Sequence, residues 1–224
     1  MRLIIFDLDQ TIIRSFSLHN QATMRAFRKV FGVRARLDEI DFAGNTIEHN
    51  LRALAKLKRI SNKDLERNLR KLTNVYINSF ISVMKGGIKR YLLPGAYSLV
   101  KRLKNNRENR LVMVTGDSRI ITNKVLKTAG LVRDFSFIVS GERGKDKKAL
   151  AKPAMKIARA RCKIDKIVWI GDSVHDVEAG KSVKALTISP LTGTSSENKL
   201  RKAGANYVFK NLNNSRIAKT IESY

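Results

Sequence analysis

Acidic residues directly follow a short apolar stretch at the start of the chain. Residues 3–6 are apolar, and Asp7, Asp9 and Thr11 come immediately after them. A run that is apolar on both faces is typical of a buried strand in a parallel sheet, and alternate residues of a strand point the same way. We therefore expect Asp7 and Asp9 to converge at the edge where open α/β sheets bind ligands. The simpler alternative is a strand that ends in an Asp-rich turn.

Two later apolar stretches also end in polar residues. Residues 111–115 finish with Thr115, and residues 166–170 are followed by Asp172 and, four positions on, Asp176. If the sheet is parallel, these side chains share one edge with the first acids.

Together these residue types suit the transfer of a phosphoryl group. Asp7 can attack phosphorus as a nucleophile and form an aspartyl-phosphate, while Asp9 acts as general acid and then general base. The Thr115 hydroxyl, the Gly116 amide and the Lys152 ammonium are candidate ligands of the phosphoryl oxygens.

A divalent cation is expected at the same place. Adjacent carboxylates repel each other unless a cation joins them, and Mg²⁺ prefers oxygen ligands. Mg²⁺ held by Asp7 and Asp172 lets an anionic nucleophile approach an anionic substrate. Asp176 is expected to orient metal-bound water or Lys152. Taken singly, Lys152 could be a surface lysine and Asp176 a first-turn helix acid, so the hypothesis depends on their order along the chain.

The segment after the first strand has the periodicity of helices. Apolar residues recur at helical spacing, and Gly86 and Gly87 follow the last of them. The expected helices cover residues 18–30, 46–58 and 61–84. Residues 15–88 are therefore predicted to form an all-helical insertion, with Gly86 and Gly87 in one of its two hinges.

The rest of the chain alternates between strand and helix patterns, which predicts a parallel sheet with helices on both faces. Pro153 lies within one predicted helix, residues 146–162, and is expected to mark its true start. We place the α/β core in residues 1–14 and 89–224. The expected strands are 3–6, 111–115, 135–139, 166–170, 185–188 and 207–209.

Composition indicates a folded protein in a reducing compartment. Of 224 residues, 43% are hydrophobic, which argues against disorder. Cys162 is the only cysteine, so no internal disulfide can form, and a cytoplasmic location is expected. No apolar run is long enough for a membrane span.

The formal net charge of +26 is unusual. Such an excess predicts affinity for polyanions such as nucleic acid. The basic residues are spread along the chain, however, and a solvated basic surface is the simpler interpretation.

As a set, the motifs resemble those of the haloacid dehalogenase-like (HAD) superfamily of hydrolases. The sequence FDLDQT, with Asp7 and Asp9, is similar to the first motif, and VMVTG to the second. Lys152 with Pro153 resembles the third, and GDSVHD the fourth. The resemblance implies a Rossmann-like core with a mobile helical cap, in the branch of phosphoglycolate phosphatases and β-phosphoglucomutases.

The resemblance also implies roles for individual residues. Asp7 is the nucleophile, Asp9 is the acid/base and gives Mg²⁺ its backbone carbonyl, and Asp172 is a metal ligand. Gln10 departs from the family's usual Gly, and Gly116 and Asp117 stand where the branch more often has Asn.

His19 begins the insertion in a segment, LHNQA, that resembles a cap-entry motif. That motif places a histidine over the leaving group in mutases and some sugar phosphatases. The alternative for His19 is a solvent-facing helix start.

The sequence thus predicts a Mg²⁺-dependent phosphatase of a small phosphorylated metabolite, phosphoglycolate-like or a sugar phosphate. A phosphomutase of the same fold is the first alternative. The others are a basic nucleic-acid-associated protein and, because of the charge, a phosphatase that acts on polynucleotide ends. Neither the substrate nor the oligomeric state can be identified from the sequence.

Overall fold

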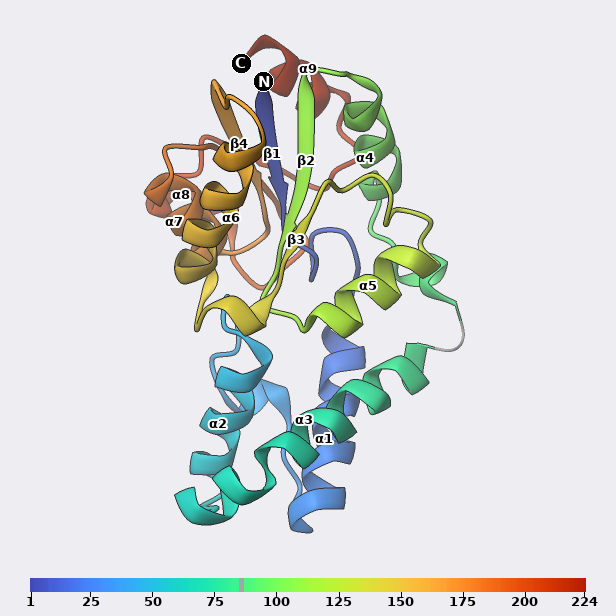
Figure 1. Ribbon diagram of the computed structural model, residues 1–224, viewed down its shortest axis with the longest axis vertical. Coiled ribbons are helices and arrows are strands. Elements are labelled where there is room, and N and C mark those ends of the chain that lie inside the picture. The colour runs from blue at the N-terminus through green and yellow to red at the C-terminus, as the bar shows by residue number, and fades with distance from the viewer. Residues whose placement is uncertain (85–86) are drawn as a thin grey trace.

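The computed structural model describes residues 1–84 and 87–224, and within them one six-stranded sheet forms the centre of the core (Figure 1). Every neighbouring pair of strands is parallel, and the order is β3-β2-β1-β4-β5-β6. The predicted α/β fold is confirmed. The strands are β1 (Arg2–Phe6), β2 (Asn109–Val114), β3 (Ile138–Val139), β4 (Lys166–Ile170), β5 (Leu186–Pro190) and β6 (Tyr207–Phe209).

Both faces of the sheet are buried, as the apolar strands require. Ile4 and Phe6 of β1 belong to a hydrophobic cluster with α4, α5 and α9. Leu3 and Ile5, which alternate with them, pack in a second cluster with α6 and α7. The core helices are α4 (Ala96–Asn105), α5 (Arg119–Thr128), α6 (Lys147–Arg161), α7 (Val174–Ser182), α8 (Glu197–Ala203) and α9 (Ser215–Ser223), with short 3₁₀ turns η3 (Ile88–Tyr91) and η4 (Gly141–Arg143).

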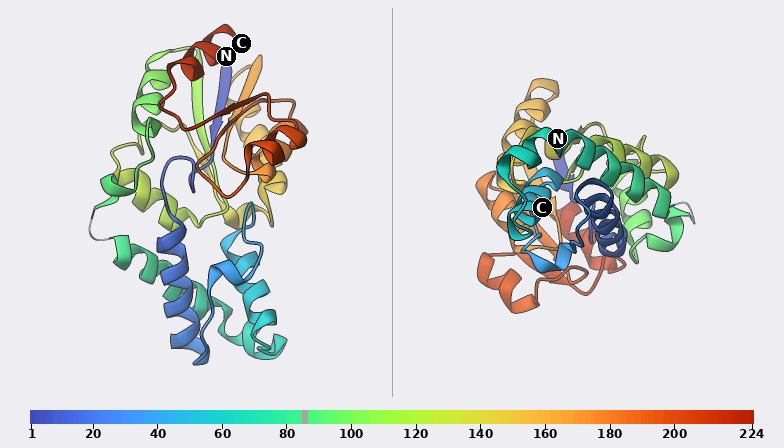
Figure 2. Two further views of the ribbon diagram at one scale, coloured as in Figure 1. Left: turned by 180° about the vertical axis from the view of Figure 1, so that it is seen from behind. Right: turned by 90° about the horizontal axis from the view of Figure 1, so that it is seen from below.

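The segment between β1 and η3 contributes, in its described residues, helices and no strand of the sheet. It contains α1 (Phe16–Phe31), η1 (Leu37–Glu39), α2 (Ile47–Leu57) and α3 (Asn62–Val83). These helices gather beyond the carboxyl ends of the central strands, while both termini lie at the opposite end of the sheet (Figures 1 and 2). The insertion therefore covers the edge where the sequence predicts the chemistry.

Side-chain caps define the starts of two of these helices. The Thr46 hydroxyl accepts a hydrogen bond from the His49 amide at the start of α2, and the Ser61 hydroxyl accepts one from the Asp64 amide at the start of α3. Leu72 of α3 and Phe27 of α1 are fully buried in the core between the helices.

The expected start of α6 at Pro153 is wrong. The helix begins at Lys147, because the Asp146 carboxylate caps it by accepting a hydrogen bond from the Ala149 amide at 2.8 Å. Pro153 lies inside the helix, where it removes one hydrogen-bond donor.

The two segments that join the insertion to the core run side by side. The Arg14 amide donates to the Tyr91 carbonyl at 2.7 Å, and the Leu93 amide donates to the Ile12 carbonyl at 3.0 Å. Of the two glycines expected in one hinge, Gly87 has a φ of 96°, and Gly86 lies outside the described residues.

Among the described residues, no helix has the length and apolar character needed to cross a bilayer.

The packing of the insertion predicts that replacing two different leucines lowers the free energy of unfolding by different amounts. Leu72→Ala is expected to lower the free energy of unfolding by about 2–5 kcal/mol, because it opens a cavity at a fully buried site. Leu57→Ala makes the same change in α2 at a side chain that is 50% exposed, and should alter stability by about 0.5 kcal/mol or less. Urea unfolding of both variants measures the difference, and equal effects would contradict the packing described for α3.

Candidate functional site

Three buried carboxylates from two strand ends come together beyond the sheet. Asp7 follows β1, Asp172 follows β4, and Asp176 lies in the first turn of α7. Their carboxylate oxygens lie within 4.8 Å of one another, and the three residues are 4%, 7% and 1% exposed. The sequence predicted that these residues share one edge, and the structure brings them together.

Lys147 is the cation among these acids. It is 4% exposed, and its ammonium donates to Asp176 Oδ1 at 2.9 Å and forms an ion pair with Asp7 Oδ1. Burial opposes its charge, but the carboxylates of Asp176 and Asp7 outweigh burial and raise the pKa of Lys147 above its usual range. The lysine is therefore charged at neutral pH.

Lys152, which we expected at this position, does not reach the site. It is exposed and does not line the cavity described below. Because α6 begins at Lys147, residues five positions apart lie about 140° apart around the helix, and only Lys147 faces the acids. The misplaced helix start explains the error.

Fixed hydrogen bonds hold Asp176. The Ser173 hydroxyl donates to Asp176 Oδ2 at 2.5 Å, and the Trp169 indole donates to Asp176 Oδ1 at 3.2 Å. A capping box forms as well: the Ser173 hydroxyl accepts from the Asp176 amide at 3.2 Å, and the Ser173 amide donates to Asp176 Oδ2 at 3.3 Å. Both carboxylate oxygens of Asp176 are therefore fixed in place, and Asp176 in turn orients Lys147. The sequence did not predict the contact between Trp169 and Asp176.

Asp172 is held by the first motif. The Thr11 hydroxyl donates to Asp172 Oδ1 at 3.0 Å. A side chain at Gly193 would collide with the other carboxylate oxygen, so a neighbouring loop also limits its position. Burial and the Asp176 carboxylate raise the pKa of Asp172 to about 7, although Lys147 opposes the shift.

The acids fit a metal site. Burial raises the pKa of Asp7 well above its usual range; Lys147 lowers it, and the charges of Asp176 and Asp172 raise it further. Three carboxylates thus face a single ammonium, and a cation with oxygen ligands would relieve their repulsion. Asp7 and Asp172 are the residues that could hold it, since Asp176 is bound by protein donors.

Thr115 and Gly116 occupy the loop after β2. The Thr115 hydroxyl is fully buried and accepts a hydrogen bond from the Asp117 amide at 3.1 Å. Gly116 lines the cavity, whereas Thr115 does not. The Gly116 carbonyl accepts from the Ile47 amide of α2 at 3.1 Å, and a side chain at Gly116 would collide with the Asn45 carbonyl. The loop and the insertion thus meet at a position that requires glycine.

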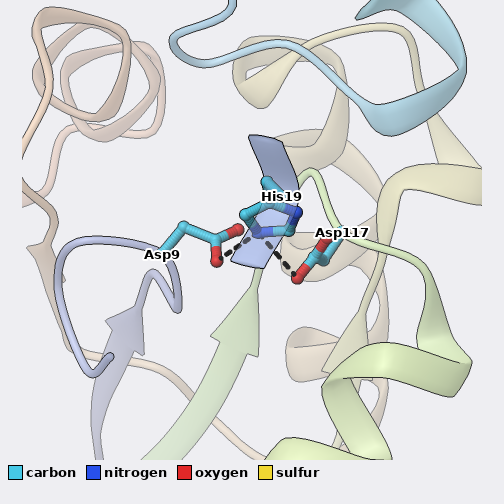
Figure 3. A group of neighbouring side chains, drawn as sticks. All are labelled: Asp9, His19 and Asp117. Atoms are coloured by element: carbon cyan, nitrogen blue, oxygen red, sulfur yellow. Dashed lines mark hydrogen bonds and ion pairs between the residues drawn. The ribbon is translucent and has the colours of Figure 1, made fainter. Parts of the chain in front are cut away.

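Asp9 lies against a second group of titratable side chains, shown in Figure 3. The ring nitrogen Nε2 of His19 is 2.9 Å from Asp9 Oδ1 and 3.7 Å from Asp117 Oδ2. Nδ1 of His19 is 2.6 Å from the Tyr76 hydroxyl of α3. His19 is 7% exposed and packs against the ring of Phe80, so it is not a solvent-facing helix start.

The charges of this group stabilise one another. Burial disfavours the imidazolium, but Asp117 and Asp9 outweigh burial and raise the pKa of His19 to about 9. Burial likewise disfavours ionised Asp9, yet the charge and hydrogen bond of His19 hold the pKa of Asp9 below its usual range. Asp9 and His19 therefore form an ion pair at neutral pH. Burial and the Asp9 charge raise the pKa of Asp117, and His19 opposes that shift.

Gln10 has a backbone conformation that is usual for glycine. It has a φ of 56°, in the left-handed region that favours glycine. Gln10 also lines the cavity described below. Its side-chain oxygen accepts a hydrogen bond from the Ser15 amide at 3.0 Å.

A cavity of about 100 Å³ joins the two groups of titratable residues. Its walls come both from the sheet edge and from the insertion. It is lined by the acids and Lys147 together with Gln10, Ser15, Phe16, His19, Leu37, Phe42, Ala43, Gly44, Asn45, Ile47, Asn50, Tyr76, Gly116, Ser173 and Thr194.

Replacing Lys147 and replacing Lys152, both in α6, should change the stability of the protein by different amounts. Lys147→Met leaves the carboxylates of Asp7 and Asp176 without their ammonium, and is expected to lower the free energy of unfolding by about 3–5 kcal/mol. Lys152→Met, at an exposed site, should change it by about 0.5 kcal/mol or less. Guanidinium unfolding without divalent cations measures both, and a larger loss at Lys152 would contradict the assignment.

Comparison with known proteins identifies the family. A model of the haloacid dehalogenase-like hydrolases matches residues 1–184. Over 211 residues the chain is 24% identical to pyrophosphatase PpaX of Halalkalibacterium halodurans, covering 93% of this chain and 92% of that protein.

Solved structures share the fold. A β-phosphoglucomutase from Clostridium difficile has a TM-score of 0.75 at 19% identity and covers 99% of this chain and 96% of its own. A protein described as a predicted phosphatase from Clostridium acetobutylicum has a TM-score of 0.73 at 21% identity, covering 100% of this chain and 99% of its own. With the family model matching most of the chain, the protein belongs to the haloacid dehalogenase-like hydrolase family.

Proposed function

We propose that this protein is a Mg²⁺-dependent phosphatase that hydrolyses a small phosphate monoester through an aspartyl-phosphate on Asp7. The observation that carries the proposal is the buried group of Asp7, Asp172, Asp176 and Lys147 at the carboxyl ends of β1 and β4. Membership of the hydrolase family supports it.

In the first step, a carboxylate oxygen of Asp7 attacks phosphorus, and the bond from phosphorus to the leaving oxygen breaks. Asp9 passes to that oxygen the proton that it shares with the His19 imidazolium, so the product leaves as an alcohol. In the second step, water attacks the phosphorus of phospho-Asp7 and Asp9 takes up the proton. Inorganic phosphate is released and the Asp7 carboxylate is restored.

The remaining residues bind and orient. Lys147, in place of Lys152, pairs with Asp7 and with phosphoryl oxygens, and the Gly116 amide is a further donor to them. Thr115 remains a candidate for the same role, although its hydroxyl already accepts a hydrogen bond from the Asp117 amide. Asp7, Asp172 and the Asp9 backbone carbonyl would hold Mg²⁺, which when bound neutralises charge between the nucleophile and the substrate.

Residues 15–88 are proposed to act as a cap over this site. Backbone hydrogen bonds join the insertion to the core: Ile47 donates to Gly116, and Lys147 donates to the Gly44 carbonyl, each at 3.1 Å. These contacts hold the insertion over the cavity, and breaking them would admit substrate. The paired connections at Ile13 and Leu92 would keep the insertion joined to the core during that opening.

A phosphomutase is the second candidate, and the contact of His19 with Asp9 favours it. A mutase must keep its phosphorylated intermediate away from water, and a buried histidine at the leaving group helps to do so. A screen of sugar phosphates separates the two, because a mutase isomerises the substrate and releases little free phosphate. Pyrophosphate belongs in the screen, since a relative of similar length is named a pyrophosphatase.

Replacement of the nucleophile tests the phosphatase directly. Asp7→Asn is expected to reduce turnover of p-nitrophenyl phosphate by roughly 10³-fold or more, because the amide cannot form the acyl phosphate. Circular dichroism should show an intact fold. The matched control is Asp165→Asn, an exposed aspartate at the amino end of β4. Wild-type turnover in Asp7→Asn would refute the mechanism.

Removal of the metal tests the cofactor. EDTA is expected to abolish hydrolysis and excess Mg²⁺ to restore it. Asp172→Asn should raise the Mg²⁺ concentration needed for half-maximal activity by at least about tenfold, because a charged ligand is lost. Undiminished activity of the EDTA-treated, dialysed enzyme would show that the acids need no metal.

A further inference from the structure

The Asp117 carboxyl group has a buried hydrogen-bond acceptor that no described residue satisfies. Its side chain is 1% exposed, it lines the cavity, and Oδ2 has no hydrogen-bond partner. His19 Nε2 lies 3.7 Å away, beyond hydrogen-bond distance, because the same nitrogen is directed to Asp9 at 2.9 Å. Figure 3 shows the two carboxylates on either side of the imidazole. A buried acceptor without a donor is costly, so Oδ2 is available to a ligand.

A second free acceptor lines the same cavity. The Asn50 side-chain nitrogen donates to the Phe42 carbonyl at 3.3 Å, which fixes the orientation of the amide. Its oxygen, Oδ1, is buried and without a partner among the described residues. Asn50 comes from α2 and Asp117 from the loop after β2, so the core and the insertion each supply one acceptor.

Asp117 lies in the part of the cavity that would hold the leaving group, and Asn50 lines the same cavity. In the proposed mechanism Asp9 must touch the leaving oxygen, and Asp117 lies in the group around Asp9. Phe16 and Phe42, whose rings are 5.3 Å apart, add apolar surface to the lining. The volume of about 100 Å³ suits a small alcohol.

We propose that Asp117 is a specificity residue that accepts a hydrogen bond from a hydroxyl or ammonium group of the leaving alcohol. The substrate class is then the phosphate esters of small alcohols that carry such a donor. This inference rests on the proposed phosphatase function and goes beyond it in naming what the enzyme selects.

The same geometry disfavours esters whose leaving group is an anion. His19 has Nε2 directed to Asp9 at 2.9 Å and Nδ1 to the Tyr76 hydroxyl at 2.6 Å, so neither ring nitrogen is free to bind a substrate carboxylate or second phosphate. Oxygens of such a group would face the Asp117 and Asn50 oxygens, which are acceptors themselves, and would gain no hydrogen bond from either.

Four esters of two-carbon alcohols isolate this effect, because they differ only in the terminal group. Hydroxyethyl phosphate carries a hydroxyl, ethanolamine phosphate an ammonium, ethyl phosphate a methyl, and phosphoglycolate a carboxylate. We expect kcat/KM for the first two to exceed that for each of the last two by at least about tenfold, the effect of one good hydrogen bond to a buried acceptor.

Asp117→Asn tests the residue itself. The amide keeps the shape of the side chain but puts an amide nitrogen, which is a donor to substrate carboxylates, in place of one acceptor oxygen. The ratio of kcat/KM for ethanolamine phosphate to that for phosphoglycolate should fall at least about tenfold, and any general loss of activity cancels in this ratio. Asp165→Asn is the control and should keep the wild-type ratio.

The results of these experiments distinguish a failure of the proposed role of Asp117 from a failure of the proposed phosphatase function. Suppose that p-nitrophenyl phosphate is hydrolysed but that kcat/KM is equal for the four esters, or is highest for phosphoglycolate. That result overturns the role of Asp117 and leaves the phosphatase function standing. An unchanged ratio in Asp117→Asn likewise overturns it. If no ester is hydrolysed at all, both proposals fail.

Discussion

Repulsion between buried carboxylates is the constraint that the other residues of the site must offset. Asp7, Asp172 and Asp176 lie within 4.8 Å of one another, away from solvent, where like charges interact strongly. One ammonium, that of Lys147, offsets part of this charge. Such an arrangement costs folding stability, and it persists because the surrounding structure fixes each acid. The remaining negative charge is what makes the site able to attract a cation.

The fold supplies that fixation from elements far apart in the chain. Parallel strands bring the ends of β1 and β4 together, the cap of α7 holds Asp176, and the cap of α6 directs Lys147 inward. The insertion then closes over this edge at Gly116, where only a residue without a side chain allows the close approach of Asn45. The accuracy of the site therefore comes from backbone geometry more than from long side chains.

Sequence patterns predicted the elements with strong, local signals. Apolar runs that end in Asp or Thr located β1, β2 and β4, because both faces of those strands are buried and their ends are not. The orientation of Lys147 was missed because Pro153 was read as a helix start, whereas Asp146 is a better cap. Asp117 and Tyr76 carried no recognisable signal, since their importance depends on contact with His19, and such long-range contacts have no period or motif. The short β3, Ile138–Val139, was predicted too long because apolar residues before it belong to a loop.

The hydrogen bond from Trp169 to Asp176 has a practical consequence. The chain has a single tryptophan, so its long-wavelength fluorescence arises from one indole, and that indole touches the acidic group directly. Emission from an indole responds to nearby charge. The protein thus carries a built-in optical reporter, through which occupancy of the acidic centre can be followed in solution without any label or added dye.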